Sequence, residues 1–138
     1  MKRGMTLIEV MVALVVIMVL FMAMAKIAVV AIRSDRYAEV HTRAALMCHE
    51  ALLKLQGLTG DPPELEAGWH EDPGNPIEQD NERYYRFWQV AEAEAGREVT
   101  LVVAWNDGSR HVAPGSFSSV EGMKQSGCPY VALHDIIP

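Results

Sequence analysis

The sequence of 138 residues lacks several features that would interrupt a long helix or supply chemistry. No proline occurs before Pro62, and no charged side chain lies between residues 10 and 25. The G-x-S-x-G, P-loop and dinucleotide motifs are absent, and the five histidines are scattered without the spacing of metal ligands. These absences argue against an enzyme, a bound cofactor and a metal site, and they favour an uninterrupted helix at the amino terminus.

Basic side chains are scarce in the second part of the chain. Residues 57–138 carry five Lys or Arg side chains against 14 Asp or Glu side chains, and the whole chain has a formal net charge of −6. Nucleic-acid binding depends on clustered Lys and Arg, so this composition argues against a dedicated nucleic-acid binder.

The amino-terminal apolar run has the length and composition of a membrane segment. From residue 5 to residue 32 the only ionisable side chains are Glu9 and Lys26, and about 20 mostly apolar residues suffice for a helix to cross a bilayer. A carboxylate within such a segment is costly unless it is paired. Glu9 is therefore expected to have a functional role and a cationic partner.

The residues around Glu9 resemble a known family. Lys2-Arg3-Gly4 followed by Met5-Thr6-Leu7-Ile8-Glu9-Val10 is similar to the class III leader and mature start of type IV pilins and pseudopilins, with Met5 in place of the commoner Phe. The resemblance implies a leader of residues 1–4, cleavage between Gly4 and Met5 by a prepilin peptidase, and N-methylation of Met5. It also implies that Glu9 pairs with the mature amine of a neighbouring subunit.

Two other interpretations of this segment stay open from the residues alone. Ala23-Met24-Ala25 fits a secretory cleavage site, which would release a product that begins at Lys26. The second interpretation is a plain single-pass membrane anchor, since Lys2 and Arg3 would hold the amino terminus in the cytoplasm in that case too. Neither interpretation accounts for Glu9.

The helix is expected to continue beyond the membrane segment, as an amphipathic half over residues 33–56. Apolar positions recur there at spacings of three and four, and they are Tyr37, Val40, Ala44, Met47, Cys48, Ala51, Leu52 and Leu55. Gly57 then fits the position that ends a helix. A helix over residues 5–56 would be about 78 Å long, so its second half offers a packing surface to a small head.

The two cysteines, Cys48 and Cys128, lie in the part of the chain that is expected to be exported. In an oxidising compartment they predict one disulfide, which would tie the carboxyl-terminal segment to the helix. Two buried free thiols are the alternative.

The remaining residues, 57–138, predict a small head rich in β-structure. Residues 58–82 contain four prolines and eight carboxylates without Lys or Arg, which predicts a surface loop. Oxygen ligands for calcium at Asp72, Asn75, Glu78 and Asp80 are the alternative there, although their spacing matches no defined loop.

Three strands are expected after this loop. Residues 84–92 and 99–105 read as two strands of a hairpin, and a turn at residues 106–109 leads into a return strand at residues 110–113. This meander resembles the head of V-type minor pilins. Residues 116–127 give no clear signal, and residues 130–137 are a candidate for a further strand or for partner contacts.

Together these patterns predict an α+β, pilin-like fold in which a long amino-terminal helix packs on a small antiparallel sheet. The resemblance implies a minor type IV pilin, with a type II secretion pseudopilin as the alternative. A single-pass membrane protein with a periplasmic binding head is the alternative of another class. The implied partners are a prepilin peptidase, other pilin or pseudopilin subunits and an inner-membrane assembly platform. The implied location is the inner membrane, with a cytoplasmic amino terminus, and then a filament.

Overall fold

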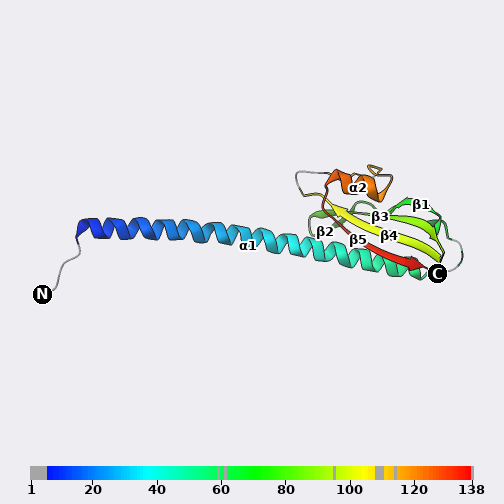
Figure 1. Ribbon diagram of the computed structural model, residues 1–138, viewed down its shortest axis with the longest axis horizontal. Coiled ribbons are helices and arrows are strands. Elements are labelled where there is room, and N and C mark those ends of the chain that lie inside the picture. Colours follow the sequence, from blue (N-terminus) through cyan, green and yellow to red (C-terminus); the bar gives the residue numbers. More distant parts are fainter. Residues whose placement is uncertain are drawn as a thin grey trace. The chain divides into compact units, whose positions relative to one another are not determined.

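The computed structural model describes residues 6–58, 60, 62–94, 96–107, 111–113 and 115–137. In chain order its elements are helix α1 (Leu7–Gln56), the 3-10 helix η1 (Pro63–Leu65), strands β1 (Gly68–Glu71), β2 (Ile77–Gln79), β3 (Glu82–Ala93) and β4 (Gly96–Trp105), helix α2 (Val120–Ser126) and strand β5 (Tyr130–Ile137) (Figure 1). The chain divides into two units, Met1–Glu39 and Val40–Pro138. Helix α1 contributes residues to both.

The first unit consists of the amino-terminal part of α1. Every residue from 6 to 39 is exposed, and the large apolar side chains include Leu7, Phe21 and Ile32, which are 81%, 68% and 68% exposed. An 18-residue window within α1 has a mean hydropathy of 2.9, so the helix is long and apolar enough to cross a membrane. A helix with an apolar surface on all sides requires lipid or other helices around it.

In the second unit, residues 40–56 of α1 pack against an antiparallel sheet. The strand order is β1-β3-β4-β5, and β2 pairs with β3 beyond the end of β1. The α+β architecture that the sequence predicts is therefore confirmed, and α1 ends at Gln56 as expected. Five residues of the predicted packing stripe are buried, namely Ala44, Cys48, Ala51, Leu52 and Leu55. Val40 and Met47 are partly buried, and Tyr37 is 59% exposed.

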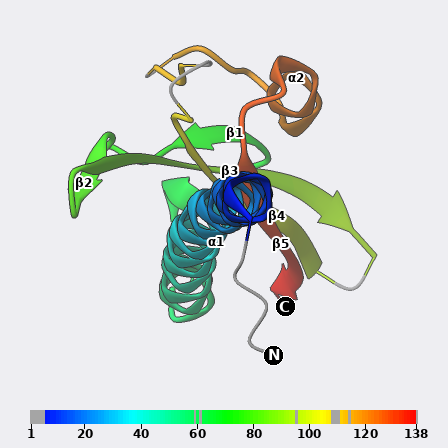
Figure 2. The same ribbon diagram turned by 90° about the vertical axis from the view of Figure 1, so that its left-hand side faces the viewer.

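The sheet separates two hydrophobic clusters. One lies between the sheet and α1, and it contains Ala44, Cys48, Leu55, Trp88 and Leu101 among others. The other lies on the opposite face, where Phe87 and Val102 of the sheet meet Val120 and Met123 of α2 and the buried Cys128. Figure 2 shows the sheet between the carboxyl-terminal part of α1 and α2. Alternation of side chains along β3 and β4 supplies apolar residues to both faces.

Two expectations for the head are wrong in part. The segment 58–82 is not a plain loop, because it contains η1, β1 and β2. Residues 111–113 form no strand, and the strand that pairs with the far side of β4 is β5. The turn residues 108–110 lie outside the described part of the chain. Residues 116–127, which give no clear sequence signal, contain α2, with Ser119 at its start and Gly127 (φ 68°) at its end.

Candidate functional site

The first turn of α1 carries the one acidic side chain of the apolar segment. Glu9 lies in this turn, and its backbone N–H donates to the carbonyl oxygen of Thr6 at 3.0 Å. The N–H of Val10 donates to the same oxygen at 3.3 Å, so the helix begins directly after Thr6. A carboxylate at a helix amino terminus is favoured by the partial positive charge of the unpaired N–H groups.

Glu9 is exposed, and so are the apolar side chains on either side of it. Leu7, Ile8 and Val10 are 81%, 73% and 42% exposed. Among the residues that the structure describes, Glu9 has no cationic partner, so its carboxylate is available to a group outside the described chain. Gly4 and Met5, the predicted cleavage and methylation residues, lie outside the described residues.

The chain matches the prokaryotic N-terminal methylation motif over residues 1–25. No curated protein and no solved structure is significantly similar to the chain. The motif match and the helix-on-sheet architecture make the chain type IV pilin-like, with a class III N-methylation leader of the kind that a prepilin peptidase processes. Pilins, which carry this kind of leader, are typically structural rather than enzymatic proteins.

The predicted disulfide between Cys48 and Cys128 is not formed. Both cysteines are free and buried, and they belong to the clusters on opposite faces of the sheet, so the sheet stands between the two sulfur atoms. The Cys48 thiol donates to the carbonyl oxygen of Val131 at 3.5 Å, and burial raises its pKa to about 12. The carboxyl-terminal strand is instead held to α1 by this contact, and by Gln56, whose Nε2 donates to Oδ2 of Asp135 at 2.7 Å.

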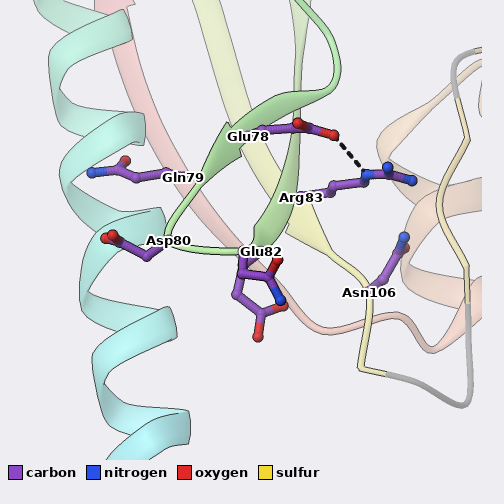
Figure 3. Close-up of a pocket in the computed structure, with 7 residues that line it drawn as sticks. Glu78, Gln79, Asp80, Glu82, Arg83 and Asn106 are labelled. Carbon is purple, nitrogen blue, oxygen red and sulfur yellow. Dashed lines mark hydrogen bonds and ion pairs between the residues drawn. The ribbon is translucent and has the colours of Figure 1, made fainter.

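The four candidate calcium ligands each have a protein partner of their own. Glu78 accepts from Nε of Arg83 at 2.9 Å, and Asp80 forms an ion pair with Arg43. Glu78 and Asp80 border a depression of about 480 Å³ at the turn between β2 and β3 (Figure 3). That turn consists of Asp80 and Asn81, both with positive φ, a conformation that Asp and Asn tolerate.

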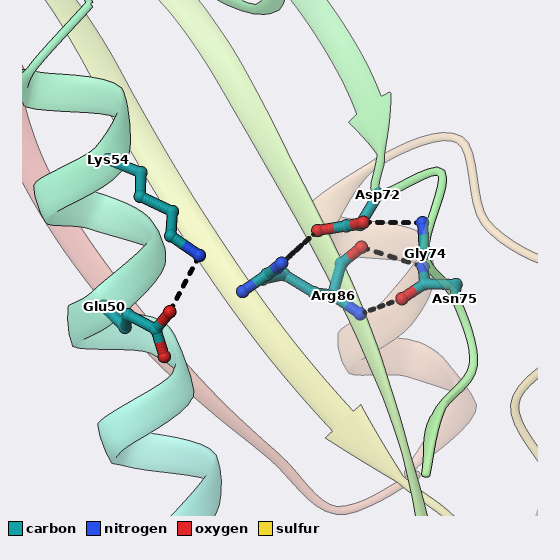
Figure 4. Close-up of polar contacts among 6 residues, drawn as sticks. All are labelled: Glu50, Lys54, Asp72, Gly74, Asn75 and Arg86. Carbon is teal, nitrogen blue, oxygen red and sulfur yellow. Dashed lines mark hydrogen bonds and ion pairs between the residues drawn. The ribbon is translucent and has the colours of Figure 1, made fainter.

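The other two candidates, Asp72 and Asn75, both bind Arg86 of β3 (Figure 4). Nε of Arg86 donates to Oδ2 of Asp72 at 2.6 Å, and Oδ1 of Asp72 accepts from the N–H of Gly74 at 2.7 Å. The described residues contain no group of three or more metal-ligating side chains. The polar residues of the connector between β1 and β2 therefore form a network with Arg86 of β3 that holds the head together.

Asn75 completes this network at the backbone. Its Oδ1 accepts from the N–H of Arg86 at 2.8 Å, and its Nδ2 donates to the carbonyl oxygen of Arg86 at 2.9 Å. Residue 86 lies between the part of β3 that pairs with β1 and the part that pairs with β2. One amide side chain thus takes the place of a strand residue at this gap.

Sequence reasoning did not identify Arg86 as important, although a signal was present. Arg86 lies on the same face of β3 as Tyr84 and Trp88, so it is a charged residue at an apolar position of the alternation. A cation that is mostly buried in this way requires a partner. The identity of that partner, Asp72, depends on how the connector between β1 and β2 folds back.

Proposed function

We propose that this chain is a minor type IV pilin, a structural subunit that assembles into a pilus filament. The observation that carries the proposal is the exposed Glu9 in the first turn of α1, whose apolar side chains are all exposed from Leu7 to Ile32. A filament core of bundled apolar helices would cover those side chains, and helices without water around them associate through close packing and paired polar groups.

In this proposal Glu9 sets the axial register of the subunit. Cleavage after Gly4 frees the amine of Met5, which is then N-methylated and carries a positive charge. When a subunit enters the bundle, its Glu9 carboxylate meets the Met5 amine of a neighbour, because either charge alone would be expensive in an apolar surrounding. A subunit shifted along the axis would leave both charges unpaired.

Before assembly, residues 5–32 would hold the subunit in the inner membrane. Lys2 and Arg3 precede this segment, and basic residues remain on the cytoplasmic side of a membrane helix. The head, with its excess of acidic side chains, would then lie in the periplasm until the assembly platform moves the subunit into the filament.

A matched pair of substitutions on one helix tests the role of Glu9. Glu9→Gln preserves size and removes the charge, and we expect normal leader cleavage with a loss of at least about tenfold in the amount recovered from sheared filaments. Glu50→Gln is the control, because Glu50 is an exposed residue of α1 that pairs with Lys54 outside the apolar segment. Equal recovery of the two variants would refute the proposed pairing.

The leader is tested through Gly4. We expect Gly4→Asp to retain residues 1–4, because a side chain at this position blocks the approach of the peptidase to the backbone. The mass of the mature chain measures this directly. A wild-type product that keeps its first four residues would instead favour a single-pass membrane protein with a binding head, and one that begins at Lys26 would favour secretion.

The choice of a pilus over a type II secretion system rests on the resemblance of β4, a Val-rich strand that ends at Trp105, to the heads of V-type minor pilins. Deletion of the gene is expected to reduce surface filaments. A loss of protein secretion with normal filaments would assign the chain to the pseudopilins.

A further inference from the structure

Strand β5 forms one edge of the sheet. It pairs with β4 over its whole length of eight residues, and the register from Arg97↔Ile137 to Ala104↔Tyr130 is continuous and contains no bulge. Among the described residues, no strand pairs with the other side of β5. A long edge of this kind presents unpaired backbone groups in a regular row.

The register identifies which backbone groups point outward. The N–H of Trp105 donates to the carbonyl oxygen of Pro129 at 3.2 Å, and in an antiparallel pair every second residue faces the partner strand. The backbone N–H and C=O groups that point toward β4 are therefore those of Val131, Leu133 and Asp135. Tyr130, Ala132, His134 and Ile136 direct their N–H and C=O groups away from the sheet.

The carboxyl-terminal end of this edge is closed by a side chain. The N–H of Ile136 donates to Oδ1 of Asp135 at 2.8 Å, and Oδ2 of Asp135 accepts from Gln56 of α1. The open part of the edge thus runs from Tyr130 to His134. It contains neither lysine nor proline, the residues that most often protect an edge strand.

The opposite side of the sheet is divided between two short strands. There the outer side of β3 is covered by β1 and β2, which have four and three residues, and Asn75 binds the backbone of Arg86 between them. Among the described residues, β5 therefore offers the longest continuous edge to a strand from another chain, because the edge strands on the other side have four and three residues.

We propose that the edge of β5 from Tyr130 to His134 pairs with an extended strand of a neighbouring pilin-like subunit. This inference rests on the proposed role in filament assembly. Main-chain hydrogen bonds supply the affinity in such an arrangement, and alternate side chains supply the specificity.

The side chains of β5 define the strand that fits. Val131 and Leu133 pack at the margin of the cluster between sheet and α1, so the neighbour's side chains on this face are apolar. On the other face lie the exposed Ala132 and His134, and His134 contacts Oγ1 of Thr100 at 3.2 Å and Oε1 of Glu98 at 3.5 Å. The neighbour's side chains on that face are polar. An amphipathic strand from the head of another subunit has this pattern.

Proline at position 132 tests the inference. Ala132→Pro removes an N–H that points away from β4, and proline is tolerated on an edge strand at such a position. Ala132→Ser keeps the N–H and is the matched control. We expect both variants to be cleaved normally, and we expect Ala132→Pro to be recovered from sheared filaments at about a tenth of the level of Ala132→Ser.

Hydrogen exchange of the wild-type full chain gives a second measurement that does not depend on a variant's folding. We expect the amides of Ala132 and His134 to exchange rapidly in detergent micelles and at least about 100 times more slowly in filaments. Equal exchange in both states, or equal recovery of the proline and serine variants, overturns the strand pairing alone. Absence of the wild-type chain from filaments overturns the assembly proposal, and the strand pairing with it.

Discussion

The ion pair between Asp72 and Arg86 provides a quantitative test of how the head is held together. Both side chains are 15% exposed, and Arg86 faces the apolar cluster beneath α1. Removal of one partner from a buried pair costs about 3–5 kcal/mol, and the residual exposure of this pair reduces the expected cost to about 2–3 kcal/mol for Asp72→Ala. The change leaves a guanidinium group without its carboxylate inside the head.

The assay is urea unfolding of the full chain in detergent micelles, followed by tryptophan fluorescence. All three tryptophans, Trp69, Trp88 and Trp105, lie in the unit that contains the sheet. Trp88 and Arg86 line the same mostly apolar cavity of about 170 Å³ between the end of α1 and the sheet. Trp88 is therefore a local reporter of the perturbed region.

Two further variants separate the terms that contribute to this cost. Asp72→Asn keeps an oxygen for the N–H of Gly74 but removes the charge and the oxygen that accepts from Arg86, so its comparison with Asp72→Ala tests the contribution of the turn hydrogen bond. In the double variant Asp72→Ala/Arg86→Met no charge remains buried, and the flexible Met side chain can fill space beside the cavity. We expect the double variant to recover about 1–3 kcal/mol relative to the sum of the single changes.

The control is Glu78→Ala, because Glu78 and Arg83 form a pair whose side chains are 65% and 61% exposed. An exposed pair contributes little, so we expect a change below about 0.5 kcal/mol. If Asp72→Ala destabilised the head no more than Glu78→Ala, the reasoning from burial would be wrong.

Three other predictions concern the same head. Cys48 is expected to resist alkylation in the folded protein at pH 8, because its raised pKa keeps it a neutral thiol. In denaturant without any reductant, both Cys48 and Cys128 should be alkylated. Detection of a disulfide by mass spectrometry would contradict this prediction. Since the pKa of this thiol is about 12 in the folded protein against an ordinary value of 9.0, it should lower the free energy of unfolding as the pH rises above about 9, an effect that Cys48→Ala should remove. Asn75→Ala should cost about 1–3 kcal/mol in urea unfolding, because it leaves the N–H of Arg86 unpaired and removes one hydrogen bond to its carbonyl oxygen, which also accepts from the N–H of Asp72 at 3.1 Å. An unchanged midpoint would show that water replaces the amide.

Local sequence patterns predicted the elements whose cause is local. Helix α1 follows from an apolar run without proline, and the stripe that includes Ala44, Cys48 and Leu55 followed from its spacing. Strands β3 and β4 followed from alternating apolar residues and aromatic side chains. The Glu9 prediction depended on a charge at an apolar position, which is visible without a structure.

Elements that depend on distant partners were not predictable in the same way. Strands β1 and β2 have the sequences GWHE and IEQ, which carry no strand signal, and they are strands because β3 pairs with them. The third strand of the meander was placed at residues 110–113, next in sequence to β4, whereas the structure uses β5. The prediction of a disulfide was wrong for a related reason, because the sequence shows two cysteines but not that a sheet separates them.

The use of Asn75 as a substitute for a strand residue fixes the length of the connector between β1 and β2. If one residue were inserted between Glu71 and Asn75, the amide would move away from Arg86; an insertion between Asn75 and Ile77 would shift the alternation of β2 relative to Tyr84. This short segment should therefore tolerate amino-acid replacement at its exposed positions much better than any change in the number of its residues.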